Sequence, residues 1–217
     1  MTELDVRRKR LLYEMGVTVW RSPPSSAGTG QAWARLEREI TRCEACELHQ
    51  GRTQAVPGSG DRQARLLIVG EAPGKTEDAR GEPFVGRSGQ LLDAMLAAIG
   101  LDRTHGVFIT NVAKCHPPGD RDPRRGEVQA CQGWLEAQIR LLAPACILAV
   151  GKVSAETLTG TRDGLGTLRG QWMAWGEATI PLRVTYHPAY LLRYPGEKAA
   201  AWEDLLAVKR ALQGAVA

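Results

Sequence analysis

The sequence predicts an α/β protein, a three-layer α/β/α sandwich around a central sheet of four parallel strands. Four short apolar runs bounded by polar residues have the length and composition of buried strands. Longer segments with apolar residues at helical spacing lie between and after these runs. Such alternation predicts parallel strands covered by helices on both faces, with a ligand cleft at the carboxyl ends of the strands.

The elements follow one another in a regular order. The expected strands occupy residues 64–71, 106–114, 145–151 and 181–188. The expected helices occupy residues 31–43, 88–100, 123–143, 152–160 and 197–213. Ser88 is expected to cap the start of the second helix and Gly100 to follow its end. Pro144 bars continuation of the third helix.

The N-terminus differs in composition from the rest of the chain. Residues 1–15 favour a short basic helix, and Pro, Ser and Gly break all periodicity in residues 17–30. We therefore expect residues 1–30 to be an extension and linker, and residues 31–217 to form one domain. The 217 residues, 43% hydrophobic and 24% charged, suit one such domain with a sizeable core.

Charge and hydropathy narrow the class of protein. The net charge of +4 permits nucleic-acid binding without establishing it. The apolar runs are far shorter than the roughly 18 residues of a membrane helix, and the charged N-terminus does not have the form of a signal peptide. We expect a cytoplasmic, monomeric protein that does not associate with membranes.

The segment GEAPGKTED, which begins at Gly70, superficially resembles a phosphate-binding loop. Only three residues separate Gly70 from Gly74, whereas that loop needs four between its glycines. Pro73 offers no N–H group to a phosphate, and the carboxylates of Glu71 and Glu77 would repel one. A nucleotide-hydrolysing function is therefore disfavoured.

Four of the five cysteines form two pairs. Cys43 and Cys46 have the C-x-x-C spacing that lets two thiolates hold one metal centre. Cys115 ends an expected strand, and Cys131 lies in the following helix, so a strand–loop–helix return can bring them together. The set suits a [4Fe–4S] cluster or a zinc ion, with unconnected core cysteines as the alternative. Cys146 opens a buried strand and is expected to be a core residue.

Four segments together resemble a known family. The segments GEAPGKTED, GEPFVGRSGQLL, TNVAKCHPP and TYHPAYLLR are similar to motifs of the type-4 uracil-DNA glycosylases, the iron–sulfur branch of the uracil-DNA glycosylase superfamily. The resemblance spans about residues 33–210. It implies a [4Fe–4S] cluster on the four paired cysteines. It also implies hydrolysis of the N-glycosidic bond of deoxyuridine in DNA, which leaves an abasic site and initiates base excision repair.

Three side chains fit the recognition of a flipped base. Phe84 can stack on the ring, unless it is a core aromatic. Asn111 can pair with uracil O4 and N3–H and so reject cytosine, unless it is a strand-end cap. His187 can donate to uracil O2, where negative charge grows as the glycosidic bond breaks, unless it is a structural histidine.

The loop that begins at Gly70 is expected to form one wall of the pocket. The resemblance implies that backbone groups of Gly70, Glu71 and Ala72 contact the base, and that Glu77 lies near uracil C5. In the best-studied enzymes of the superfamily an Asp stands where this chain has Ala72. Glu71 is therefore the expected group that activates water and stabilises the positively charged sugar.

The segment PAYLLRYP is expected to approach DNA. Leu191 is the first candidate for the apolar wedge that fills the gap left by the flipped nucleotide, and Leu192 is the second. Arg87, Ser88 and Arg193 are candidates for phosphate contacts.

Two further functions stay open at this point. A relative that traps uracil-DNA covalently would carry GEQPG and an inserted basic, His-bearing loop after PFVG, and this chain has neither. A non-catalytic iron–sulfur DNA-binding module would have the same cysteines without base excision. No Lys is placed as a Schiff-base nucleophile, so we expect an enzyme that does not cut the DNA strand.

Overall fold

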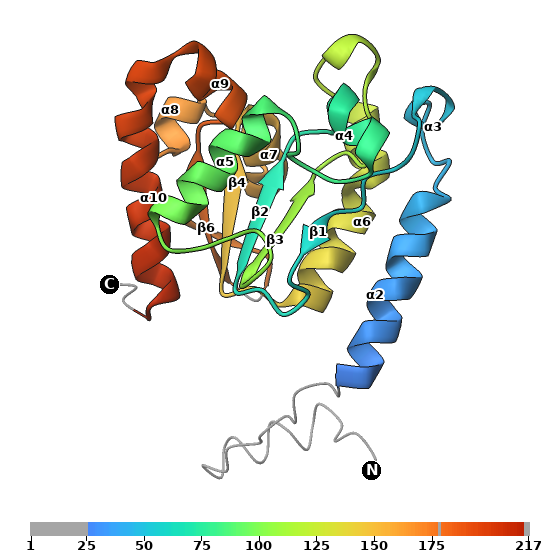
Figure 1. The fold of residues 1–217 in the computed structure, drawn as a ribbon, viewed down its shortest axis with the longest axis horizontal. Helices are drawn as coiled ribbons and strands as arrows, with labels where there is room; N and C mark the ends of the chain where they lie inside the picture. The colour runs from blue at the N-terminus through green and yellow to red at the C-terminus, as the bar shows by residue number, and fades with distance from the viewer. Residues whose placement is uncertain (1–25, 178, 215–217) are drawn as a thin grey trace.

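The computed structural model describes residues 26–177 and 179–214, and it has the predicted three layers (Figure 1). Its central four strands are parallel, as predicted: β3 (Val107–Asn111), β2 (Leu66–Gly70), β4 (Cys146–Val150) and β6 (Ile180–Thr185). The prediction of a four-stranded sheet is wrong at both edges. An antiparallel strand extends each side, β1 (Ser59–Gly60) beside β3 and β5 (Trp172–Trp175) beside β6.

Helices cover both faces of this sheet. The α-helices are α2 (Ser26–Thr41), α3 (Leu48–Gly51), α4 (Lys75–Arg80), α5 (Arg87–Ala98), α6 (Arg125–Leu142), α7 (Lys152–Thr159), α8 (Leu165–Leu168), α9 (Pro188–Arg193) and α10 (Lys198–Leu212). Two 3₁₀ turns, η1 (Pro118–Asp120) and η2 (Pro195–Glu197), join them. In this described part of the chain, no helix is long and apolar enough to cross a bilayer.

The alternation of side chains along each strand builds two cores. Leu67 and Val69 of β2 pack with α2, α6, α7 and α8, whereas Leu66 and Ile68 pack with α5, α9 and α10. Every residue of β2, β3 and β4 is buried. The continuous apolar runs in the sequence are thus explained, because strands in the middle of a three-layer fold bury both faces.

Two expected boundaries differ from the structure, and a third agrees with it. Helix α2 begins at Ser26, inside the expected linker, and the expected helix at residues 1–15 lies outside the described residues. Ser88 does not cap α5, because the helix already begins at Arg87 and Gly86 occupies the cap position. Gly100 follows the end of α5 with φ of +81°, as predicted.

Candidate functional site

A pocket of about 410 Å³ opens at the carboxyl ends of β2 and β3. Loops after β2, β3 and β6 contribute its wall. Its lining residues are Glu71, Ala72, Pro73, Gly74, Glu77, Phe84, Ser88, Asn111, Pro117, Asp120, Arg121, His187, Ala189, Tyr190 and Arg193. The predicted cleft at the strand ends is therefore confirmed, and most of the candidate base-binding residues face it together.

Asn111 is the most informative side chain of the pocket. It is the last residue of β3 and is 1% exposed. Its side-chain oxygen Oδ1 has no hydrogen-bond partner within the described residues. A buried polar atom without a partner costs about 1–3 kcal/mol, so such an atom in a pocket marks a place where a ligand completes the bonding. The strand-end cap that was the alternative for Asn111 would instead bond to its own chain.

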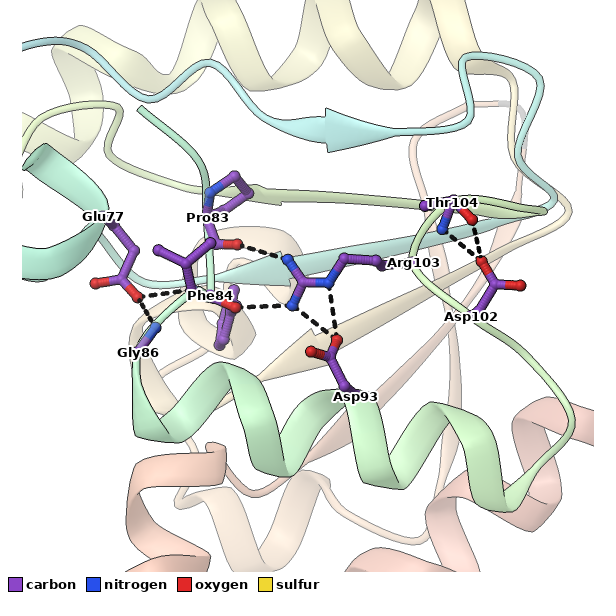
Figure 2. A network of polar contacts seen from close by, with 9 residues as sticks. Glu77, Pro83, Phe84, Gly86, Asp93, Asp102, Arg103 and Thr104 are labelled. Atoms are coloured by element: carbon purple, nitrogen blue, oxygen red, sulfur yellow. Dashed lines mark hydrogen bonds and ion pairs between the residues drawn. The ribbon is translucent and has the colours of Figure 1, made fainter. Parts of the chain in front are cut away.

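Phe84 lies in the pocket wall in a strained conformation that its surroundings hold in place (Figure 2). Its φ of +54° is costly for a bulky side chain. The guanidinium of Arg103 donates to the carbonyl oxygens of Phe84, at 2.7 Å, and Pro83, at 3.3 Å. Glu77 Oε1 accepts from the N–H groups of Val85 and Gly86, both at 2.9 Å. Bonds from two directions thus fix the loop that carries the ring.

Two glycines allow this arrangement. A Cβ atom on Gly89 would lie 1.7 Å from the carbonyl oxygen of Phe84. A Cβ on Gly70 would lie 2.3 Å from Asn111 Oδ1 and 2.6 Å from the Phe84 ring. Any larger residue at either position would displace the ring or the carboxamide. Gly70 does not line the pocket itself; it leaves the room that these two groups occupy.

His187 faces Phe84 across the pocket, with ring centroids 5.5 Å apart. Its Nδ1 accepts a hydrogen bond from the N–H of Ala189 at 3.2 Å, so the proton of a neutral ring is on Nε2. Burial and, to a lesser extent, the charge of Arg193 lower the pKa of His187 to about 4, against the opposing effect of Glu77. At neutral pH the imidazole is uncharged and offers one N–H donor.

Glu71 forms a carboxyl pair with Asp122, which comes from the segment after β3. Burial raises the pKa of Glu71 to about 8, and the hydrogen bond and charge of Asp122 act in the same direction. Two carboxyl groups can share a hydrogen bond only when one of them holds a proton. Arg121 anchors this segment through two bonds to Glu127, at 2.6 and 2.8 Å. The raised pKa keeps Glu71 largely protonated near neutral pH.

The segment after His187 is helical, which changes the candidate wedge. Leu191 was the first choice, but α9 turns it into the core, where it is 1% exposed. Leu192 is 39% exposed and is the leucine of this segment that reaches the surface. Arg193 and Ser88 line the pocket, whereas Arg87 is exposed at the start of α5.

The four paired cysteines, Cys43, Cys46, Cys115 and Cys131, line one small hollow of about 10 Å³ between α2, α3, α6 and the end of β3. The predicted convergence is confirmed. Within residues 26–214, apart from 178, no three His, Cys, Asp or Glu side chains are arranged to hold a metal ion. Cys146 lies apart in the core, as expected.

Polar groups already point at the cysteine sulfurs. Arg52 donates to Cys115 Sγ at 3.0 Å, and the indole N–H of Trp134 donates to Cys43 Sγ at 3.3 Å. Burial raises the pKa of Cys131 to about 11 and raises that of Cys115 as well. Donors of this kind stabilise thiolates and are typical of sulfur ligands around a metal centre.

Lys114 lies between the cysteines and the pocket and is 1% exposed. Its Nζ donates to the carbonyl oxygen of Asn111 at 2.6 Å and to the side-chain oxygens of Thr110 and Gln138, both at 2.7 Å. Gln138 belongs to α6, the helix that also carries Cys131. A chain of short bonds therefore links the two sites.

Comparisons with known proteins match this geometry. The family model of the uracil DNA glycosylase superfamily matches residues 57–206. A type-4 uracil-DNA glycosylase of Pyrobaculum aerophilum is 44% identical, over 79% of this chain and 90% of its own length. Those of Archaeoglobus fulgidus and Thermotoga maritima are 41% and 40% identical, over 74% and 73% of this chain and 83% and 82% of theirs. The chain belongs to the type-4 uracil-DNA glycosylase family.

Sequence reasoning missed part of this type-4 pocket. Asp120, Arg121 and Tyr190 line it, and Asp122 bonds to Glu71, yet none of the four was singled out. The sequence did carry a signal for Asp120, Arg121 and Asp122, because the charged run GDRDP follows the strand that ends in Asn111. The position of Tyr190 in the pocket could be predicted only if the segment after His187 was known to be helical.

Proposed function

We propose that this protein flips deoxyuridine out of DNA and hydrolyses its N-glycosidic bond, leaving an abasic site and initiating base excision repair. The observation that carries the proposal is the buried, unpaired Oδ1 of Asn111 in a pocket that also holds a neutral imidazole. Membership of the type-4 uracil-DNA glycosylases gives this pocket its substrate class.

Recognition of the base rests on complementary hydrogen bonds. The Asn111 carboxamide accepts from uracil N3–H and donates to O4, and cytosine presents the inverse pattern. Phe84 stacks on the flipped ring, held by the loop that Arg103 and Glu77 clamp. Glu77 stands at the C5 edge, where it disfavours the methyl group of thymine. Backbone groups of Glu71 and Ala72 complete the wall, whereas Gly70 leaves the room that the Phe84 ring and the Asn111 carboxamide occupy.

Bond cleavage places negative charge on the base and positive charge on the sugar. His187 Nε2–H donates to uracil O2 and stabilises the departing anion, and its lowered pKa keeps it neutral at physiological pH. The Glu71–Asp122 pair supplies negative charge beside the sugar and positions the attacking water. Glu71 is the group that takes the proton of the water once it is ionised.

The surrounding surface positions the DNA. Leu192 is the wedge that fills the gap left by the flipped nucleotide, because Leu191 is buried. Arg87, Ser88 and Arg193 contact phosphates and so position the strand without reading its sequence. These assignments make the partner uracil-containing DNA.

We infer a [4Fe–4S] cluster rather than zinc at the cysteine site, as the resemblance to the iron–sulfur branch implies. Cys43, Cys46, Cys115 and Cys131 surround one hollow, and Arg52 and Trp134 donate to two of their sulfurs. Such N–H···S bonds are typical of iron–sulfur sites. A cluster there would join α2, α6 and the segment after Asn111. It gives the site a structural function, with no step of the hydrolysis assigned to it.

We also propose that the glycosylase domain occupies residues 31–217, extended at its start by the first turn of α2, and that residues 1–30 are otherwise an N-terminal extension. The protein acts as a monomer in the cytoplasm. These proposals rest on composition and on the single pocket-bearing sheet of the described residues.

The test is incubation of a uracil-containing oligonucleotide with the protein, followed by electrophoresis with and without alkali. We expect free uracil and a strand that breaks only after alkali. No abasic product would overturn the proposal and favour a non-catalytic DNA-binding module. A protein–DNA adduct that survives denaturation would favour the covalent trapping reaction, and tight binding of magnesium nucleotides would revive nucleotide hydrolysis.

A further inference from the structure

Three tyrosines form a continuous stack beside the pocket. Tyr186, Tyr190 and Tyr194 are spaced four residues apart along the end of β6 and α9. The rings of Tyr186 and Tyr190 lie 5.0 Å apart with an interplanar angle of 27°, and those of Tyr190 and Tyr194 lie 4.6 Å apart with an angle of 37°. We call this set the tyrosine stack.

The inner end of the tyrosine stack is closed and fixed. The guanidinium of Arg169 lies 4.3 Å from the centroid of the Tyr186 ring. Arg169 is itself held by the buried carboxylate of Asp204, which also binds Arg183 of β6. A ring packed between a held guanidinium and a second ring has little freedom to move. The order of the stack is therefore built into the fold.

The outer end of the stack is open. Tyr194 is 55% exposed and Leu192 is 39% exposed. In the part of the chain that the structure describes, both are among the few large apolar side chains that lie exposed. Tyr190, in the middle of the stack, lines the pocket together with Arg193. The aromatic row thus runs continuously from the wall of the pocket to solvent. The proposed hydrolysis assigns no function to Tyr194.

An exposed aromatic ring next to an arginine suits an unpaired nucleobase and its phosphate. Stacking of a base on an aromatic side chain contributes about 1–3 kcal/mol and tolerates any base sequence. Arg193, next to Tyr194 in the chain, supplies positive charge for the adjoining phosphate. In a duplex the neighbours of the flipped nucleotide stay stacked and paired, whereas in a single strand they are free to leave the stack.

We propose that Tyr194, backed by Tyr190 and Tyr186, is a stacking platform for an unpaired base that flanks the flipped uracil. The platform makes single-stranded DNA a favoured substrate over duplex DNA. This inference rests on the proposed function, since it concerns the strand on either side of the uracil pocket.

The experiment measures kcat/KM for uracil release from a single-stranded pentanucleotide with a central deoxyuridine. A second pentanucleotide replaces both flanking nucleotides with tetrahydrofuran abasic residues, which keep the phosphates and remove the bases. The proteins are the wild type, Tyr194→Ala and Tyr194→Phe. The Phe variant keeps the ring and removes only the hydroxyl, so it is the matched control.

We expect Tyr194→Ala to lower kcat/KM about 5- to 150-fold on the base-flanked strand, the loss that corresponds to one stacked base. Tyr194→Phe keeps the activity, and all three proteins act equally on the abasic-flanked strand. On a U·G duplex the loss in Tyr194→Ala is smaller than on the single strand.

Equal activity of Tyr194→Ala and the wild type on the base-flanked strand would overturn the platform. So would an equal loss on both pentanucleotides, which indicates a structural or phosphate contact instead. Failure of the wild type to release uracil from any substrate contradicts the proposed function rather than this inference.

Discussion

The candidate pocket and the cysteine site both lie near the carboxyl end of β3, yet they are organised in opposite ways. In the pocket, protein bonds already fix the wall: Arg103 and Glu77 hold the Phe84 loop, and Ala189 holds the ring of His187. In this pocket the buried Oδ1 of Asn111 remains without a hydrogen-bond partner.

At the cysteine site, the protein environment does not favour the thiolate form that a metal needs. Its thiols are half-buried or buried, and burial raises the pKa of Cys131 and Cys115 although thiolates are the form that binds metal. A cationic centre resolves this conflict, because metal binding deprotonates the ligands and adds its free energy to folding. The fold alone thus organises the pocket wall, whereas the metal centre proposed at the cysteines would add its binding free energy to folding.

The largest effect is expected in the pocket. Glu71→Gln removes the group that becomes the water-activating carboxylate and should lower single-turnover uracil release about 10²–10⁴-fold. The iron content should stay at the wild-type value, because Glu71 is not in contact with the cysteines. Glu82→Gln, an exposed change in the next loop, is the control and should have wild-type activity. Full activity of Glu71→Gln would remove Glu71 from the mechanism.

Mutation of the cysteine site should first lower the iron content and the stability, and lower the activity only as a consequence. Cys131→Ser should reduce iron from about four atoms per chain to about none and lower the unfolding temperature, with activity falling as folded protein is lost. Cys146→Ala is the matched control, since this buried cysteine lies outside the hollow and should keep the iron. Iron content and the absorbance near 400 nm are the measurements. A Cys131→Ser protein with full iron would contradict the ligand assignment.

Lys114 is the residue that should couple the two sites. Lys114→Met removes three short hydrogen bonds and leaves their buried acceptors short of a donor, which costs about 1–3 kcal/mol of unfolding free energy. Because one acceptor is the backbone carbonyl of Asn111, uracil release should fall as well, by about tenfold. Chemical denaturation and kinetics on the same preparation test this. Lys152→Met, at an exposed site on α7, should change neither.

The smallest effect is a shift along the pH axis. Since the pKa of Glu71 is raised to about 8, its carboxylate forms only as the pH rises through that value, and kcat/KM should increase over this range. Asp122→Asn removes a negative charge and provides an N–H donor to the carboxylate, so the rise should move about one unit toward acid. Asp163→Asn, exposed and distant in sequence, should leave the profile unchanged. An unshifted profile in Asp122→Asn would show that the pair does not set the protonation of Glu71.

Much of this architecture could be predicted from the sequence. The four parallel strands are short apolar runs between polar boundaries, and the segments at their carboxyl ends carry most of the residues that meet in the pocket. The convergence of the two cysteine pairs followed from the strand–loop–helix return between Cys115 and Cys131. These features depend on local pattern and on parallel connectivity, which a single sequence records well.

The missed features depend on contacts between distant residues. Strand β1 has two residues, and β5 exists because it pairs with β6 at the sheet edge. The last strand was expected to run to residue 188, but β6 ends at Thr185, and α9 begins at Pro188 because proline fits the first turn of a helix. That helix decides which leucine is exposed, because adjacent residues on a helix point about 100° apart. Asp122 reaches Glu71 only through the anchoring of its segment by Arg121.

The most direct test of the account compares how strongly the wild-type protein and the Asn111→Asp variant prefer uracil over cytosine. Release of each free base from otherwise identical single strands is measured under single-turnover conditions, with thermal unfolding as the check on folding. We predict that the wild type prefers uracil by about 10⁴-fold or more, and that Asn111→Asp loses most of this preference because its carboxyl group can accept from the cytosine amino group. A folded Asn111→Asp protein with undiminished preference for uracil would contradict the claim that this side chain reads the base.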